Sequence, residues 1–493
     1  MTVFMMFAVT ACSSDDDDAS DATIAAAAGV SQADYDAAVA DAETTISELE
    51  AQIAATAPAS VLVQTAVADP GSGTSSPSGW DTEVSLENKI ELLASYDTSG
   101  DPDAFDPVEH PKVFVTSEGH GYIGFISETY SQSGFQVIDA VTKEHVYSRA
   151  FDLGYEKHGT PHGLGVSMDG RWIYVPTSDG GNAFIPTTPN GGRVLVVDSR
   201  TGTLHQVIGT GFTGPHHIKA FYDYAGNSRV IVETSGGPVY LLDPDDDNRV
   251  VAALGPDLLY GRNYQVDADP TGTYLYIGLT LGTRRNVYDS NGGAVAKYEL
   301  ETGAVTYING VGQYPNGFTF SADGKLTYVA DMVEGMLYKI DNATNRVLKR
   351  SQTATAGPYE ICLNYDETQV WAVGKGEFGW ILDGRMGMVD TKSMRAGYAL
   401  DVGGQTMDHC FMNPWDPDEL WITSSGTAET IVLDMATRSV KARIPDANGG
   451  DTHGGAFVEY NPDFTGFMVN DMSGPRGWFL EDIEAAAAAA AAG

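Results

Sequence analysis

The sequence predicts an all-β fold, a seven-bladed β-propeller of four-stranded blades, and three observations support this prediction. The 493 residues include 56 glycines and 24 tyrosines, which suits many short strands joined by tight turns. One pattern of strand, Asp-Gly turn and strand recurs, as in TPHGLGVSMDGRWIYVPTS at 160–178 and YPNGFTFSADGKLTYVADM at 314–332. The repeats have about the 40–50 residues of a four-stranded propeller blade.

Seven residues open these repeats, each at the expected start of an innermost strand: His162, His216, Asn263, Asn316, Tyr359, His409 and His453. The last block, at 452–471, lacks outer strands, whereas the segment from residue 108 has outer strands and no inner one. Joining the two predicts a seventh blade shared between the ends, which leaves no exposed sheet edge at the seam. The propeller is therefore expected over residues 108–475, followed by a tail at 476–493.

The repeats resemble the YVTN-type β-propeller family, in which DG-x-x-x-YV and VID-x-x-T recur. This resemblance covers the predicted propeller, 108–475, and implies its fold. It says almost nothing about function, because one fold serves many functions.

The N-terminal segments predict export and anchoring. The run FMMFAVTAC at 4–12 resembles the lipobox of bacterial lipoproteins, which implies a signal peptide over 1–11 and lipidation of Cys12. The expected location is the bacterial cell envelope, on the outer membrane, at its periplasmic face or on the cell surface. A short apolar start with an incidental cysteine is the alternative.

An acidic tether at 12–30 precedes an amphipathic helix expected at 31–57. Apolar residues in this helix follow a heptad spacing, which suits pairing with copies of itself as a coiled-coil stalk. Packing of the helix on the body of its own chain is the other interpretation. A linker is expected at 58–107, where Pro58 ends the helix and Gly, Ser and Pro gather.

Charge and cysteine content exclude several classes of function. With 67 acidic and 28 basic residues the chain has a net charge of −39, so nucleic acid is not an expected partner. Three cysteines exclude a disulfide scaffold and a four-cysteine metal site. We expect Cys362 and Cys410 to be buried small hydrophobic residues.

The block-opening residues predict a metal site. In a propeller the innermost strands line the central channel, so these residues should form a ring at one axial mouth. Converging neutral imidazoles are ligands for copper or zinc, and copper is favoured over zinc and haem where histidines dominate. The predicted ligands are His162, His216, His217, His409 and His453, and the additional candidates are His158, His120, Asn263 and Asn316.

Two acidic residues, Asp408 and Asp451, flank predicted ligands and are expected to orient them. The histidine-bearing openings also resemble those of the nitrous oxide reductase propeller, and the resemblance implies copper at the same five histidines. Asn263 and Asn316 depart from that family's pattern, and its cupredoxin domain has no counterpart after residue 475. Full nitrous oxide reduction is therefore not expected.

The functional prediction is an exported, lipid-anchored propeller with a copper site at the channel mouth. If the protein is an enzyme, it is expected to be a copper-dependent oxidoreductase acting on a small molecule. The alternative is a non-catalytic scaffold that binds another envelope protein or a polymer. In that case the histidines would fill a wet, polar channel mouth by bonding to one another and to ordered water.

Overall fold

A computed structural model describes the propeller and part of the preceding segment. The described residues are 90–118, 133–154, 162–179, 188, 191–211, 214–234, 236–255, 258–259, 261–280, 292–376, 383–450, 452–472 and 474–475. The predicted signal peptide with Cys12, the tether, the helix at 31–57 and the tail lie outside this part. His120, His158 and Asp451 also lie outside it.

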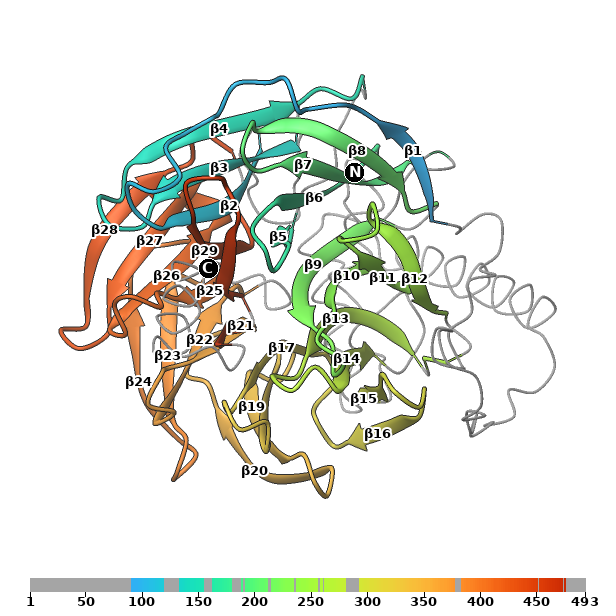
Figure 1. Ribbon diagram of the computed structural model, residues 1–493. Coiled ribbons are helices and arrows are strands. Elements are labelled where there is room, and N and C mark those ends of the chain that lie inside the picture. Colours follow the sequence, from blue (N-terminus) through green and yellow to red (C-terminus); the bar gives the residue numbers. More distant parts are fainter. Residues whose placement is uncertain are drawn as a thin grey trace, which may run out of the picture. The chain divides into compact units, whose positions relative to one another are not determined.

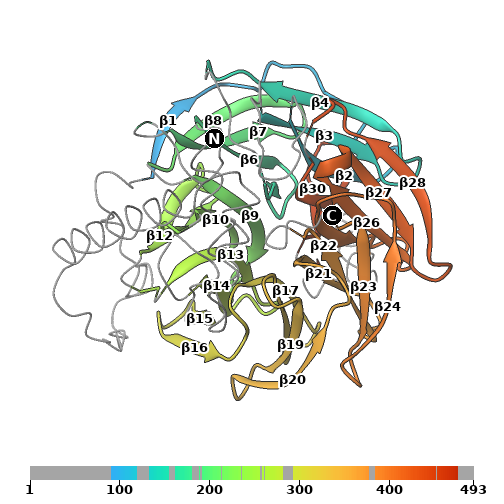
Figure 2. The same cartoon turned by 180° about the vertical axis from the view of Figure 1, so that it is seen from behind.

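The described strands form seven antiparallel sheets arranged around an axis, which confirms the seven-bladed β-propeller (Figures 1 and 2). We number the blades from the one shared by both ends of the chain. Blade 2 contains β5 (Gly165–Val166), β6 (Trp172–Ser178), β7 (Gly192–Asp198) and β8 (Thr203–Gly209). Blade 3 contains β9 (Pro215–Tyr222), β10 (Ser228–Thr234), β11 (Val239–Asp243) and β12 (Arg249–Leu254). Blade 4 contains β13 (Arg262–Ala268), β14 (Tyr274–Thr280), β15 (Gly293–Glu299) and β16 (Val305–Asn309).

The other blades follow the same order along the chain. Blade 5 contains β17 (Pro315–Phe320), β18 (Leu326–Asp331), β19 (Met336–Asp341) and β20 (Arg346–Gln352). Blade 6 contains β21 (Pro358–Leu363), β22 (Gln369–Gly374), β23 (Arg385–Asp390) and β24 (Arg395–Asp401). Blade 7 contains β25 (Met407–Met412), β26 (Glu419–Ser424), β27 (Glu429–Asp434) and β28 (Ser439–Pro445). A single-turn 3₁₀ helix, η5 (Ser425–Thr427), is the helical element within the described ranges, where no helix is long and apolar enough to cross a membrane.

Blade 1 closes the ring with strands from both ends of the chain, as predicted. It contains β29 (Gly455–Tyr460), β2 (Lys112–Glu118), β3 (Ser133–Asp139) and β4 (His145–Phe151). β2 pairs with β29 in the register Lys112↔Val458 to Val115↔Gly455. The ends of the ring are therefore joined by a continuous ladder of backbone hydrogen bonds.

The strand that follows β29 does not occupy the second position of blade 1, because β2 already pairs with the outer edge of β29. This strand, β30 (Gly466–Asp471), pairs with the opposite, axial edge of β29 and is followed by β31 (Gly474–Pro475). β30 also bonds to the neighbouring blade, where the Met468 amide donates to the Met168 carbonyl at 2.9 Å. The side-chain amide of Asn470 donates to the backbone carbonyl of Met412, in blade 7, at 2.7 Å. The chain therefore fills part of its own central channel.

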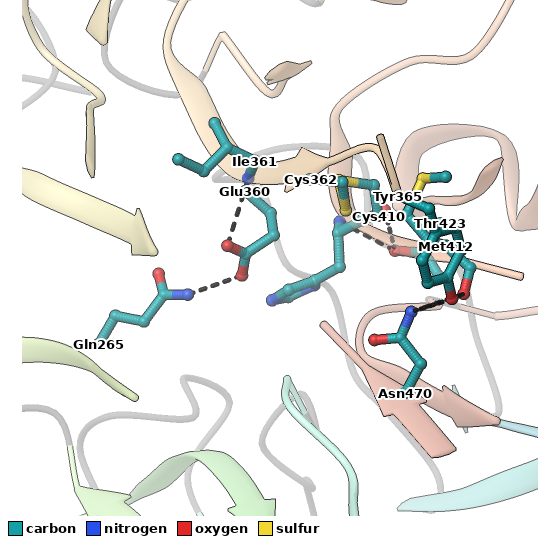
Figure 3. Close-up of a disulfide and its surroundings, with 10 residues drawn as sticks. Gln265, Glu360, Ile361, Cys362, Tyr365, Cys410, Met412, Thr423 and Asn470 are labelled. Atoms are coloured by element: carbon teal, nitrogen blue, oxygen red, sulfur yellow. Dashed lines mark hydrogen bonds between the residues drawn. A yellow bond between two sulfur atoms is a disulfide. The ribbon is translucent and has the colours of Figure 1, made fainter. Parts of the chain in front are cut away.

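Two features differ from the sequence prediction. β1 (Glu91–Ser95) lies within the expected linker at 58–107 and adds a fifth, outer strand to blade 2 by pairing with β8. Cys362 and Cys410, expected as separate buried residues, are fully buried but form a disulfide with a Cα–Cα distance of 6.1 Å (Figure 3). Alternation along a single strand did not reveal this pair, because the two residues lie on innermost strands of adjacent blades.

Candidate metal centre

A break in register recurs on the innermost strands where they approach the axis. In β9 the pairing with β10 shifts between Val232 and Thr234, opposite the His216–His217 pair. Equivalent shifts interrupt β13, β17, β21 and β25 at their block-opening residues. A bulge turns two neighbouring side chains toward one side of a strand, instead of alternating them. Two adjacent histidines of one strand can therefore both contribute to an axial site.

The structure brings all five predicted ligand histidines into one cluster. Ring centroids are 4.2 Å apart for His162 and His453, and 4.5 Å apart for His162 and His216. The His216 and His217 centroids are 3.8 Å apart, and those of His217 and His409 are 5.1 Å apart. None of the five side chains exceeds 7% exposure. We call these five residues the histidine cluster.

One nitrogen–nitrogen contact in this cluster joins blades 3 and 7. Nε2 of His217 lies 3.0 Å from Nε2 of His409. The remaining ring nitrogen of each, Nδ1, is buried and has no hydrogen-bond partner among the described residues. Two imidazole nitrogens at this distance share either a proton or a metal ion.

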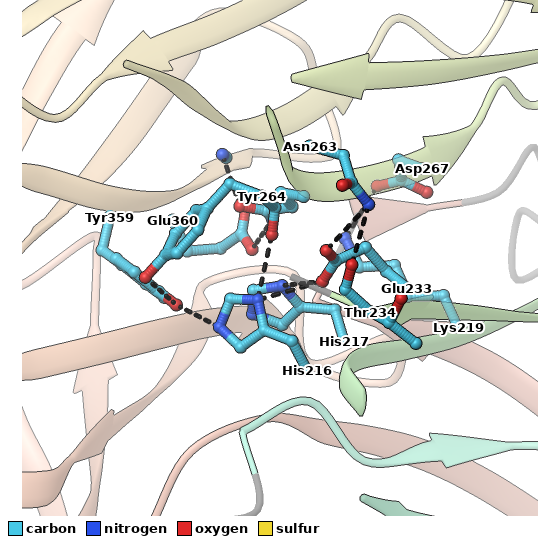
Figure 4. Close-up of polar contacts among 12 residues, drawn as sticks. His216, His217, Lys219, Glu233, Thr234, Asn263, Tyr264, Asp267, Tyr359 and Glu360 are labelled. Atoms are coloured by element: carbon cyan, nitrogen blue, oxygen red, sulfur yellow. Dashed lines mark hydrogen bonds and ion pairs between the residues drawn. The ribbon is translucent and has the colours of Figure 1, made fainter. Parts of the chain in front are cut away.

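His216 has a different set of partners (Figure 4). Its Nδ1 lies 3.0 Å from a carboxylate oxygen of Glu233 and 2.9 Å from the backbone carbonyl of Tyr264. Its Nε2 lies 3.1 Å from the hydroxyl of Tyr359. Both nitrogens of this ring are therefore engaged by protein groups, unlike those of His217 and His409.

Asp408 contacts the cluster at His453, as the sequence led us to expect. A carboxylate oxygen of Asp408 lies 3.4 Å from Nδ1 of His453 and 2.6 Å from the ammonium group of Lys375. Burial alone would raise the pKa of Asp408, but His453 and Lys375 outweigh it and hold that pKa below its usual value. The carboxylate therefore stays ionised and can orient the His453 ring.

Burial also determines the charge of the imidazoles. It lowers the pKa of His162, His216, His217 and His409 well below the ordinary value, and the neighbouring histidines lower it further. These rings are neutral at pH 7, the form in which a ring nitrogen offers a lone pair to a metal. Burial raises the pKa of Glu233 well above the ordinary value.

The additional candidates in blades 4 and 5 bind protein groups. The Asn263 amide donates to Glu233 at 3.1 Å and to the carbonyl of Thr234 at 3.1 Å. The Asn316 amide donates to the carbonyl of Tyr359 at 2.7 Å. Both residues thus satisfy polar groups beside the histidine cluster.

Sequence reasoning did not include Glu233 or Lys375 in the site. Glu233 lies on the second strand of its blade, and its carboxylate approaches ring nitrogens of His216 and His217 within a group spanning 4.8 Å. A carboxylate within the apolar run VIVETS was the available signal, because an unpaired buried charge is costly. Lys375 follows the strand QVWAVG of blade 6 and is fully buried, which is a comparable signal.

The described histidines outside the cluster, His110, His145 and His205, occupy other places in the propeller. His205 stacks on Trp172 with ring centroids 4.3 Å apart, and His145 contacts the carbonyl of Pro445. His110 pairs with Asp139 at 2.8 Å. Four of the five clustered histidines occupy equivalent opening positions in the repeats, and His217 follows His216 directly in the sequence.

Comparisons with known proteins agree with a propeller. A model of the SMP-30/Gluconolactonase/LRE-like region matches residues 188–425, somewhat less than half of the chain. No curated protein sequence matches the chain.

Several solved structures are similar to this chain. Dihydro-heme d1 dehydrogenase NirN in complex with DHE has a TM-score of 0.45 and 16% identity, covering 77% of this chain and 82% of its own. The periplasmic gluconolactonase PpgL of Pseudomonas aeruginosa has a TM-score of 0.49 and 17% identity, with coverage of 70% and 99%. Hydrazine synthase of Kuenenia stuttgartiensis has a TM-score of 0.45 and 15% identity, with coverage of 60% and 92%.

Proposed function

We propose that the histidine cluster binds a transition-metal ion, with copper favoured over zinc. The observation that carries this proposal is the 3.0 Å separation of the Nε2 atoms of His217 and His409. Imidazole nitrogens bind such metals at about 2.0–2.1 Å, so two nitrogens this far apart can reach one ion. His216 lies beside this pair, and both of its ring nitrogens contact protein groups. His162 and His453, on blades 2 and 1, are the further proposed ligands.

The chemistry of the donors favours copper. All the proposed ligands are imidazoles, and the four whose pKa values are lowered are neutral at pH 7. Imidazole suits copper, and copper exceeds zinc in the affinity order of divalent metals. Copper would supply one-electron redox chemistry, so an enzyme built on this centre would be an oxidoreductase acting on a small molecule.

The same proposal includes export and a lipid anchor at Cys12. The disulfide between Cys362 and Cys410 supports export, because disulfides persist in oxidising compartments and are rare in the cytosol. A cell-envelope location also agrees with the acidic net charge of −39, which opposes binding to nucleic acid. We further propose that the segment at 31–57 pairs with copies of itself.

Elemental analysis tests the metal proposal. The chain would be purified without a histidine tag, incubated with copper or zinc, and freed of unbound metal. We expect near-stoichiometric metal in the parent and its loss in a His162→Ala, His409→Ala double variant that still folds. The matched control is His205→Ala, which removes a histidine stacked on Trp172 outside the cluster and should retain the metal. A parent that stays empty after both incubations would refute the proposal.

The second candidate is a scaffold that binds another envelope protein. One observation favours it, the edge strand β1, where Leu92 is 53% and Tyr96, just beyond its end, is 51% exposed. Edge strands with exposed apolar side chains are templates for pairing with a partner. A parent without metal that recovers an envelope partner through β1, with a loss of binding in Leu92→Lys, would support this function instead.

A further inference from the structure

Met472, at the end of the axial strand β30, lies close to the histidine cluster. β30 runs antiparallel to β29 on its axial side, so it ends toward the channel mouth, where β29 begins (Figure 2). The last pair of this ladder is Ala456 with Asp471, and Met472 follows directly. Met472 is therefore level with the start of β29, which His453 precedes by two residues. Its side chain is fully buried.

Two glycines leave the space that the Met472 side chain occupies. Gly163 and Gly454 directly follow the proposed ligands His162 and His453 in the sequence. A Cβ atom at Gly454 would overlap Sδ of Met472 and would lie 2.9 Å from Cα of Gly163. The amide of Gly454 also donates to the carbonyl of His162 at 2.8 Å. The thioether therefore lies where the openings of blades 1 and 2 meet.

The other proposed ligands are carried by the strands next to this position. The amide of Gly163 donates to the carbonyl of His216 at 2.8 Å, and a Cβ atom at Gly163 would lie 2.6 Å from Cδ2 of His217. β31, which begins two residues after Met472, lies near β25, the strand that carries His409. Met472 is thus surrounded by the backbone segments that present the histidine cluster.

We propose that Met472 supplies a thioether ligand to the metal centre proposed above, and that this ligand favours copper(I). The inference rests on that centre and names the oxidation state it prefers. Thioether sulfur is a soft donor that selects copper(I), whereas imidazole also suits zinc and other divalent metals. Neutral imidazoles with one thioether bind the reduced ion more tightly than imidazoles alone, which raises the reduction potential of the bound copper.

Met468 offers a matched control on the same strand. It is 2% exposed and belongs to the hydrophobic core that blade 1 shares with its neighbour. Methionine commonly fills irregular gaps in such cores, because its side chain is flexible. If Met472 only filled space, its replacement by leucine would affect copper no more than the same replacement at Met468.

Copper X-ray absorption and chelator competition test the inference. The full chain would be loaded under nitrogen with one equivalent of copper(I), and bicinchoninic acid would compete for the ion. We expect a sulfur scatterer in the first coordination sphere of the parent and its loss in Met472→Leu. Copper(I) affinity should fall about tenfold or more, since loss of even a supporting group typically lowers metal affinity by about 10–100-fold.

The change should be selective for the reduced ion. Copper(II) affinity should fall less in Met472→Leu, and a tenfold selective loss of copper(I) affinity lowers the reduction potential by about 59 mV. Met468→Leu should match the parent in scatterer, affinity and potential. A purely structural role of Met472 would shift both affinities together and leave the potential unchanged, which would overturn the inference.

The remaining outcomes separate this inference from the metal centre. A parent that binds copper through nitrogen alone, or a Met472→Leu variant that keeps the sulfur scatterer, would overturn the role of Met472 and leave the centre standing. A parent that takes up no copper would refute both. If Met472→Leu does not fold, Met332→Leu decides, because Met332 is a second buried methionine near the ring, with Sδ 4.0 Å from the Asn316 amide nitrogen. Retention of the sulfur scatterer in that variant would support Met472, and its loss would overturn the assignment.

Discussion

The two halves of the axial ring share a backbone and differ in chemistry. Blades 7, 1, 2 and 3 present His409, His453, His162 and His216, whereas blades 4, 5 and 6 present Asn263, Asn316 and Tyr359. Register shifts occur at the opening residues of both halves, in β9 and β25 as in β13, β17 and β21. The bulge therefore determines only where the opening residue lies. The side chain of that residue decides what the ring can bind.

The halves differ in their hydrogen-bond partners, although Oδ1 of Asn316 in the amide half is also buried without a partner among the described residues. Asn263 and Asn316 donate to defined protein acceptors, and Tyr359 contacts His216. In the histidine half, His217 and His409 face each other and retain unpartnered Nδ1 atoms within the described ranges. Buried polar atoms without partners are rare, and one explanation is a ligand.

The disulfide joins the two halves, and removing it should have the largest effect on stability. Cys362 of blade 6 and Cys410 of blade 7 are 48 residues apart in sequence. A closed loop of this length lowers the entropy of the unfolded chain enough to stabilise the fold by about 4 kcal/mol. Cys362→Ala, Cys410→Ala should lose a comparable free energy of unfolding, measured by guanidinium denaturation. An unchanged midpoint would show that the link does not stabilise the ring.

Glu360, next to Tyr359, allows the stability of the half formed by blades 4, 5 and 6 to be tested as a function of pH. Burial raises the pKa of this carboxyl to about 8, and Lys219 opposes the shift in part. Because the folded-state pKa is raised, the stabilising contribution is fully present below the unfolded pKa, near 4.5, and is lost as the pH rises through about 8.

Glu360→Gln keeps an oxygen for the amide of Gln265, which donates to Glu360 at 2.6 Å. It should remove most of the loss of stability between pH 5 and 9, which we expect to be of the order of a few kcal/mol. Unfolding free energies across this range provide the measurement. A parent as stable at pH 9 as at pH 5 would contradict the prediction.

The smallest expected effect concerns Asp408, in the half of the ring that carries the histidines. Asp408→Asn removes the charge that orients His453 and pairs with Lys375. Loss of such a supporting carboxylate typically lowers metal affinity by about 10–100-fold. Competition with a chromophoric chelator would measure this change. Asn263→Ala is the comparison from the other half and should leave metal affinity closer to the parent, so equal losses would show that the halves do not differ.

The sequence determined the repeating architecture and the ring. Asp-Gly turns, alternating strands and the incomplete blocks at both ends predicted seven blades closed by a shared one, and the pairing of β2 with β29 bears this out. Equivalent positions in repeats occupy equivalent places around an axis, so four histidines could be assigned to one cluster from spacing, and His217 was added as the neighbour of His216. Metal binding at that cluster stays a prediction.

Only the tertiary structure decided which groups meet across blades. The contact of His217 with His409, the pairing of Asp408 with Lys375 and the disulfide all join residues from different sheets, whose separation no periodicity along one strand specifies. The axial position of β30 likewise follows from competition for one edge of β29. The alternation of residues in the sequence predicts which face of its own strand a side chain occupies. Distances between strands of different blades come instead from the packing of the whole ring.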